Sequence, residues 1–133
     1  MTNLPITRKQ AIDLLKSMPQ TQSDMNHYLE SEAIMKSLAE KLGENKEYWA
    51  MLGLLHDVDW ALTKNNIQQH CIKAKEILKQ KGFNEEFINT IISHGYRYQE
   101  IPKYKDKQRT KKIQHALAAS ETITGLIYAY ALM

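Results

Sequence analysis

Cysteine occurs only once in the 133-residue chain, at Cys71, so no internal disulfide can hold the fold together. The N-terminus also lacks the apolar segment of a secretory signal peptide. A reducing, cytoplasmic location is therefore expected. The single thiol is interpreted as a small core residue, because a buried cysteine most often fills that role.

Long apolar runs are missing as well. The most apolar stretch, "HALAASETITGLIYAYALM" at residues 115–133, is interrupted by Ser120, Glu121 and Thr122. It has fewer than the ~18 uninterrupted apolar residues of a membrane span. A buried helix is predicted, without membrane association. Because the chain ends on this segment with no polar tail, we expect either a homo-oligomer contact through the helix or a chain that is part of a longer protein.

Glycine and proline are scarce, at 5 and 3 residues, and β-branched runs are few, which leaves little material for a sheet. Apolar side chains instead recur at helical spacing. Helices are predicted at residues 7–18, 24–42, 45–55, 66–81, 84–93 and 109–133, with Thr7 and Asn84 as N-caps and with Gly43 and Gly82 as stops. The length and a charged fraction of 25% indicate an ordinary globular protein. We expect an all-α bundle of about five to six helices forming a single domain, residues 1–133.

The stretch "LGLLHDVDW" at residues 52–60 places His56, Asp57 and Asp59 at the end of a segment that is otherwise apolar. Adjacent helical residues point ~100° apart, and a metal ion between the two directions can bind an imidazole nitrogen and a carboxylate oxygen. Such an ion also compensates a buried carboxylate. The alternative is a hydrogen-bonded histidine and aspartate that only cap a helix end.

Four more blocks accompany this stretch: "HYLESEAIMKSLAEKLG" from His27, "HCIKAKEIL" from His70, "IISHGYRY" around His94, and "SETITGLI" at 120–127. In this order, the blocks resemble the HD-domain superfamily of metal-dependent phosphohydrolases, most closely the small stand-alone HDIG-type hydrolases. The resemblance covers residues 20–133 and implies an HD-like helical bundle. His115 falls outside the blocks and is interpreted as a surface or helix-face residue.

The resemblance also implies a metal site. The implied ligands of one divalent ion are His27, His56, Asp57 and Glu121. A second ion would be held by His70 and His94, with Asp57 as the bridge. Nitrogen and oxygen donors suit Mn, Fe, Co, Ni or Zn, with Mg at an oxygen-rich position, and do not distinguish among these metals.

The implied reaction is hydrolysis of a phosphomonoester or a nucleotide phosphate by a metal-activated water or hydroxide. Asp57 and Asp59 are the predicted catalytic residues, with Asp59 orienting a ligand or the water. A solvent-facing carboxylate at a helix end is an equal alternative for Asp59. The expected substrate is small and phosphorylated, and nucleic acid is not expected, because no RNA-binding motif is present.

The chain departs from the family pattern at two positions. The distal ligand is usually an aspartate, whereas Glu121 is one methylene longer. The lysine of the "HDIGK" form is replaced by Ala61, so a cation that contacts phosphate must come from elsewhere. Candidates are Lys64, Lys73, Arg97 and the loop 103–112.

Residues 97–112 contain seven basic and two acidic side chains, a net charge of +5. A solvated loop is the favoured interpretation, and attraction of an anionic substrate is the alternative. The departures at the metal site support a second hypothesis for the whole chain. It would be a catalytically weak or inactive HD-fold module with a regulatory or scaffolding role, and with a structural metal or none.

Overall fold

The computed structural model describes residues 3–131, with side chains for residues 3–124. Within that part of the chain every regular element is helical and no strand occurs. The elements are α1 (Arg8–Lys16), α2 (Gln22–Leu42), α3 (Lys46–Leu55), α4 (Trp60–Thr63), the 3₁₀ turn η1 (Ile67–Gln69), α5 (Ile72–Gln80), α6 (Glu85–Ile92), the 3₁₀ turn η2 (Ser93–Gly95) and α7 (Lys112–Ala131). The prediction of an all-α bundle with five to six helices is confirmed, with α4 as an additional single turn.

The predicted caps are present at several helix ends. The Thr7 side chain accepts from the backbone N–H of Gln10 and caps α1, and Asn84 caps α6 in the same way through Phe87. Gly43 ends α2 in the left-handed conformation, with a φ of 70°. These ends follow local sequence signals, which is why they could be predicted.

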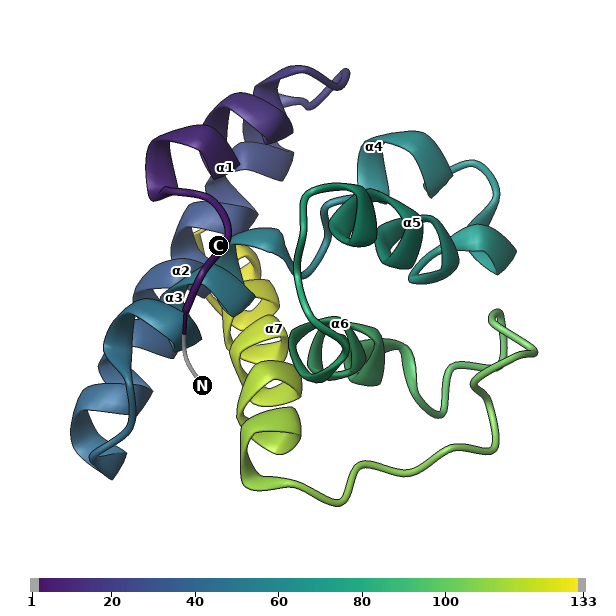
Figure 1. Ribbon diagram of the computed structural model, residues 1–133. Helices are drawn as coiled ribbons and strands as arrows, with labels where there is room; N and C mark the ends of the chain where they lie inside the picture. The colour runs from purple at the N-terminus through teal and green to yellow at the C-terminus, as the bar shows by residue number, and fades with distance from the viewer. Residues whose placement is uncertain (1–2, 132–133) are drawn as a thin grey trace.

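Helix α3 is the most completely buried of the described helices, and all of its residues from Tyr48 to Leu55 are buried. Figure 1 shows α2 running beside it, and both α6 and α7 also contact α3. Helix α2 approaches α3 at Gly53, where an added Cβ would clash with the backbone carbonyl of Ser31. This close approach brings the C-terminal end of α3 against α2, and that end carries His56 and Asp57.

The expected helix at 66–81 is wrong in its first part. The chain instead forms η1, turns at His70 and Cys71, and begins α5 only at Ile72. Cys71 has a φ of 71°, a left-handed value that breaks a helix. Its backbone N–H donates to the buried carboxylate of Asp59, at 2.7 Å. A contact between residues twelve positions apart therefore overrides the local helical pattern.

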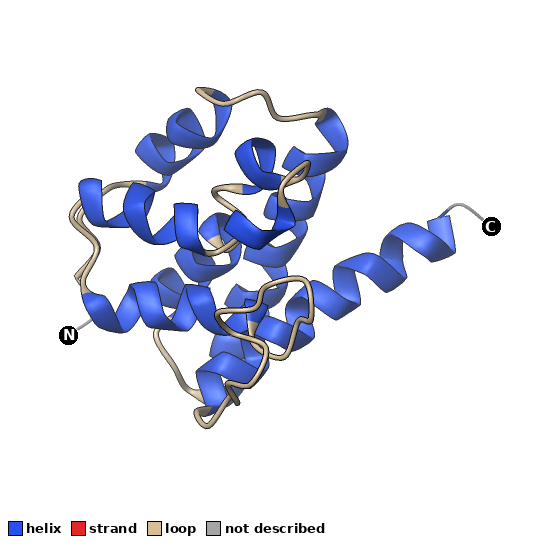
Figure 2. Cartoon of the chain, turned by 90° about the vertical axis from the view of Figure 1, so that its right-hand side faces the viewer, coloured by secondary structure: helices blue, strands red, loops and turns tan. Residues whose placement is uncertain are grey.

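The last helix begins at Lys112 rather than at the expected residue 109. Gln114 explains the later start, because its side-chain oxygen accepts from the backbone N–H groups of Thr110 and Lys111. Figure 2 shows the backbone of α7 extending beyond the other helices at its C-terminal end. The expected oligomer contact falls on residues 125–133, whose side chains lie outside the described ones. None of the described helices combines the length and the apolar content needed to cross a membrane.

Candidate metal centre

Asp57 lies at the centre of the site, and each of its two carboxylate oxygens faces a pair of histidines. Oδ2 is 3.1 Å from Nε2 of His27 and 3.3 Å from Nε2 of His56. Oδ1 is 3.3 Å from Nε2 of His70 and 3.0 Å from Nε2 of His94. The two Nε2 atoms within each pair are 3.1 Å apart. The two groups are called the outer position (Oδ2, His27, His56) and the inner position (Oδ1, His70, His94).

Hydrogen bonds at the opposite ring nitrogen fix the proton of each imidazole. His56 Nδ1–H donates to the carbonyl of Gly53 at 2.7 Å, and His94 Nδ1–H donates to the carbonyl of Ile91 at 2.6 Å. A carbonyl oxygen can only accept, so Nδ1 carries the proton in both rings. In the neutral imidazole, Nε2 then presents a lone pair toward Asp57.

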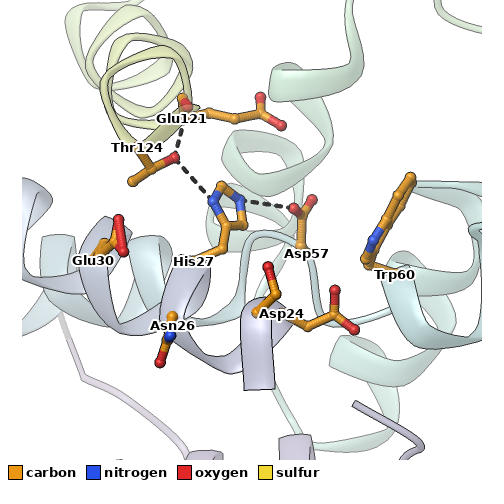
Figure 3. A pocket seen from close by; sticks show the side chains of 9 residues that line it. Asp24, Asn26, His27, Glu30, Asp57, Trp60, Glu121 and Thr124 are labelled. Atoms are coloured by element: carbon orange, nitrogen blue, oxygen red, sulfur yellow. Dashed lines mark hydrogen bonds and ion pairs between the residues drawn. The ribbon is translucent and has the colours of Figure 1, made fainter. Parts of the chain in front are cut away.

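His27 and His70 are held by side chains. Thr124 donates its hydroxyl hydrogen to the carbonyl of Glu121, so its oxygen accepts from His27 Nδ1–H, at 2.9 Å (Figure 3). His70 Nδ1–H donates to Asp59 Oδ1 at 2.7 Å. In their neutral forms all four imidazoles therefore point an Nε2 lone pair at one carboxylate.

The donors fit divalent ions at both positions. At each position two imidazole lone pairs and one carboxylate oxygen lie 3.0–3.3 Å from one another, and they repel unless a cation lies among them. Asp57 is only 6% exposed, and its Oδ1 has no hydrogen-bond partner. Two donors that bind one ion at ~2.1 Å are at most ~4.2 Å apart, a limit that the observed separations satisfy.

Glu121 reaches the outer position from α7. Donor atoms of His27, His56, Asp57 and Glu121 all lie within 4.8 Å of one another. Figure 3 shows the Glu121 side chain extending from α7 across the cavity toward Asp57. The extra methylene of glutamate therefore does not remove this carboxylate from the site.

Similarity to known proteins identifies the family of this chain. The family model described as "HD domain" matches residues 25–126. The chain belongs to the HD-domain family. No solved structure matches the chain significantly.

Several curated proteins named Ribonuclease Y are similar to this chain. That of Thermosipho melanesiensis is 36% identical over 73 residues, which cover 55% of this chain and 14% of the relative. That of Mesoplasma florum is 28% identical over 100 residues, covering 75% of this chain and 19% of the relative. The chain thus spans less than a quarter of the length of these relatives, and the similarity is distant.

Asp59, two residues after the HD doublet, is fully buried and does not face solvent. Besides holding His70, its carboxylate accepts from the backbone N–H groups of Cys71 at 2.7 Å and Ala74 at 2.9 Å. These groups begin α5, where a carboxylate also interacts favourably with the helix dipole. Asp59 therefore orients a histidine and anchors a helix, and it does not line either cavity at Asp57.

The electrostatic environment around Asp57 favours positive charge between its carboxylate and the surrounding imidazole rings. Burial lowers the pKa of His70, but the adjacent carboxylates of Asp57 and Asp59 outweigh burial and raise the pKa to about 10. Burial likewise opposes protonation of His94, whose pKa is nevertheless raised by nearby negative groups including Asp57. Burial would raise the pKa of Asp57, and the surrounding histidines instead hold it well below its ordinary value. The cluster thus requires cations, which are either protons or a metal.

Two cavities meet at Asp57, and both are lined by Trp60 and Glu121. The larger, of about 530 Å³, lies on the His27 side and is walled by Asp24, Glu30 and Thr124 among others. The smaller, of about 370 Å³, lies on the His70 side near Tyr98 and Glu100. None of the described residues that line them is lysine or arginine. Asp57 thus borders a cavity on each side, and carboxylates rather than cations line both.

The predicted substrate-binding cations lie outside these cavities. Lys64 contacts the wall of the larger cavity, because its Nζ is 3.2 Å from Asp24. Lys73 pairs with Glu76 on the exposed side of α5, at 3.6 Å. Arg97 is exposed, in the left-handed conformation. Of these three cations, only Lys64 forms an ion pair with a residue that lines a cavity.

The basic loop is mostly exposed, but Arg109 is hydrogen-bonded to η2 and to the residue that follows it. Its guanidinium donates to the carbonyls of Ser93 at 3.0 Å, His94 at 3.1 Å and Tyr96 at 3.2 Å. His115 is exposed on α7, as expected.

The sequence interpretation did not single out Arg109 or Thr124. Thr124 follows Glu121 by three residues and so shares its helix face, a spacing that could have revealed it. Arg109 carries no such signal, because its partners belong to η2 and the turn after it.

Proposed function

We propose that this HD-domain protein is a metal-dependent phosphohydrolase that acts on a phosphomonoester or a nucleotide phosphate. One observation carries the proposal: Asp57 presents each oxygen to two imidazoles whose Nδ1 atoms are already committed as donors. Such an arrangement suits two divalent ions bridged by one carboxylate. Superfamily membership supports the same chemistry.

The proposed ligands are His27, His56, Asp57 and Glu121 at the outer position, and His70, His94 and Asp57 at the inner one. A bound divalent ion supplies an activated water at neutral pH and neutralises charge on the phosphoryl group. The residues around it fix the imidazoles in one tautomer and keep solvent away from their far side. Mn, Fe, Co, Ni, Zn and Mg all remain candidates.

The larger cavity favours approach of the substrate on the His27 side, where the ring is 27% exposed while those of His56 and His94 are fully buried. Carboxylates line the entrance, so the phosphoryl group is expected to bind at the metal centre itself. Lys64 is the proposed supporting cation, released from Asp24 when substrate binds. Trp60 offers an aromatic face at the wall shared by both cavities.

A second candidate is hydrolysis of an RNA phosphodiester. It is favoured by the similarity to proteins named Ribonuclease Y and by cavities on both sides of Asp57. The absence of lysine and arginine among the described lining residues opposes it, because phosphate backbones are generally bound by cations. The smaller phosphoester is therefore the first choice.

The test combines metal analysis with turnover. Purified protein is assayed for bound metal, stripped, and reloaded separately with Mn, Co, Ni, Zn or Mg. Hydrolysis of p-nitrophenyl phosphate, bis(p-nitrophenyl) phosphate and a short RNA is then compared. Turnover of the monoester supports the first candidate, and preference for the diester and RNA supports the second.

Asp57→Asn should abolish both metal retention and turnover, because the bridge loses its charge and one acceptor oxygen. The matched control is His115→Gln, which changes an exposed histidine outside the site. Retained activity in the Asp57 variant would move the chemistry elsewhere. A metal-free protein that stays inactive after reconstitution would refute the enzyme and favour the regulatory or scaffolding module.

A further inference from the structure

The only cysteine of the chain lies beside the inner position. Cys71 is fully buried, and its Sγ is 3.9 Å from Nε2 of His94. Donor atoms of His70, Cys71 and His94 all lie within 4.8 Å of one another. The thiol therefore borders a set of metal donors as well as the apolar core.

The separation between sulfur and nitrogen is compatible with one shared ion. Zinc binds thiolate at ~2.3 Å and imidazole at ~2.1 Å, so the two donors of one ion are at most ~4.4 Å apart. The observed 3.9 Å lies within that limit. Gly95 leaves the space that the sulfur occupies, because a Cβ there would lie 2.8 Å from Sγ.

Asp57 gives a second, independent indication of a cation at this place. Its Oδ1 is buried, has no hydrogen-bond partner, and is 3.0 Å from His94 Nε2 and 3.3 Å from His70 Nε2. An unpaired buried carboxylate oxygen beside two imidazole lone pairs needs a positive charge. The sulfur of Cys71 approaches the same Nε2 of His94, which is the ring nitrogen whose lone pair is free.

The conformation of Cys71 is fixed by the same carboxylate that orients His70. Asp59 accepts from the backbone N–H of Cys71 through Oδ2 and from His70 Nδ1–H through Oδ1. The two adjacent side chains are therefore positioned together. A left-handed φ at a non-glycine residue is uncommon, and here this hydrogen bond maintains it.

We propose that Cys71 supplies a thiolate ligand to the inner position, making it selective for a thiophilic divalent ion such as Zn, Co or Fe. On metal binding the thiol proton passes to solvent, and sulfur forms the bond to the metal. The outer position has only nitrogen and oxygen donors and opens to the larger cavity, so it accepts harder ions such as Mn or Mg. The inference rests on the metal centre proposed above.

Cobalt(II) substitution tests this proposal through a readout independent of activity. Thiolate bound to Co(II) gives a near-ultraviolet charge-transfer absorption that nitrogen and oxygen ligands do not give. Because the chain has one cysteine, such a band in the stripped, Co(II)-loaded full chain can come only from Cys71. The band is expected in the wild type and in His115→Gln, and its loss is expected in Cys71→Ser and Cys71→Ala.

The outcomes separate the two proposals. Cobalt that binds the wild type without a thiolate band overturns the Cys71 ligand and leaves the metal centre standing. Failure of cobalt to bind at all overturns the metal centre and the ligand with it. A band that persists in folded Cys71→Ala also overturns the assignment. The wild-type spectrum decides the question even where a variant fails to fold, which circular dichroism would reveal.

Discussion

Asp59→Asn is the substitution that most sharply tests how the protein controls its histidines. Asp59 is fully buried and accepts three hydrogen bonds, one from His70 Nδ1 and two from backbone N–H groups at the start of α5. Asparagine has the same shape but only one acceptor atom. If its oxygen keeps the two backbone bonds, its NH₂ group faces His70 Nδ1–H, and two donors oppose each other.

The expected response is a change of tautomer at His70. Moving the proton from Nδ1 to Nε2 restores a hydrogen bond with the introduced amide but removes the lone pair that points at the inner position. Loss of such a supporting contact typically costs ~10 to 100-fold in metal affinity. The fold also loses a hydrogen bond to a charged group, worth ~1.5–3 kcal/mol. For a chain of this length, that corresponds to a fall in Tm of ~5 to 12 °C.

The assay is competition with a chromophoric chelator, which resolves the affinities of the two metal equivalents, together with thermal unfolding of the metal-free protein. Asp106→Asn provides the matched control, because Asp106 is an exposed carboxylate of the basic loop. The weakening should affect one equivalent much more than the other. Unchanged affinities for both equivalents, with the expected loss of stability, would show that Asp59 only anchors α5.

Three further outcomes are expected. Thr124→Val removes the acceptor of His27 Nδ1–H and should weaken metal binding at the outer position by ~10-fold or more. Thr122→Val, on the exposed side of the same helix, should leave this affinity unchanged. Equal effects of the two substitutions in the chelator assay would contradict the prediction. Gly53→Ala forces α3 away from the α2 backbone and should lower stability by ~1–3 kcal/mol, so an unchanged denaturation midpoint would refute the close approach. Since the pKa of His70 is raised to about 10, metal must displace a proton from it at neutral pH. The metal affinity should therefore fall as the pH is lowered. Calorimetric binding heats that do not depend on the ionisation enthalpy of the buffer would exclude this proton release.

The fold could be predicted wherever the determining interactions are local. The helical spacing of apolar residues and the caps at Thr7, Gly43 and Asn84 involve neighbours three or four positions apart. The prediction failed at residues 66–81, where the apolar pattern is helical but the carboxylate of Asp59 holds Cys71 in a left-handed turn. No residue within that segment indicates that Cys71 has a hydrogen-bond partner twelve residues away.

The candidate ligands were selected by residue type and by the order of their blocks, whereas their roles depend on geometry. The sequence could not divide the four histidines between Oδ1 and Oδ2 of Asp57, because α2, the end of α3, η2 and the turn before α5 contribute one each. Nor could it decide between the two interpretations of Asp59. Burial and three hydrogen bonds exclude the solvent-facing carboxylate.

By itself, the sequence determined the all-helical class, most helix ends and membership of a family, because these depend on periodicity, local capping and the order of motifs. Only the tertiary structure decided which oxygen of Asp57 meets which imidazole, that Asp59 holds His70, and that the cysteine borders the inner position. Those contacts join residues that are far apart in the chain. Their distances depend on how the helices pack, for which a single sequence carries no direct signal.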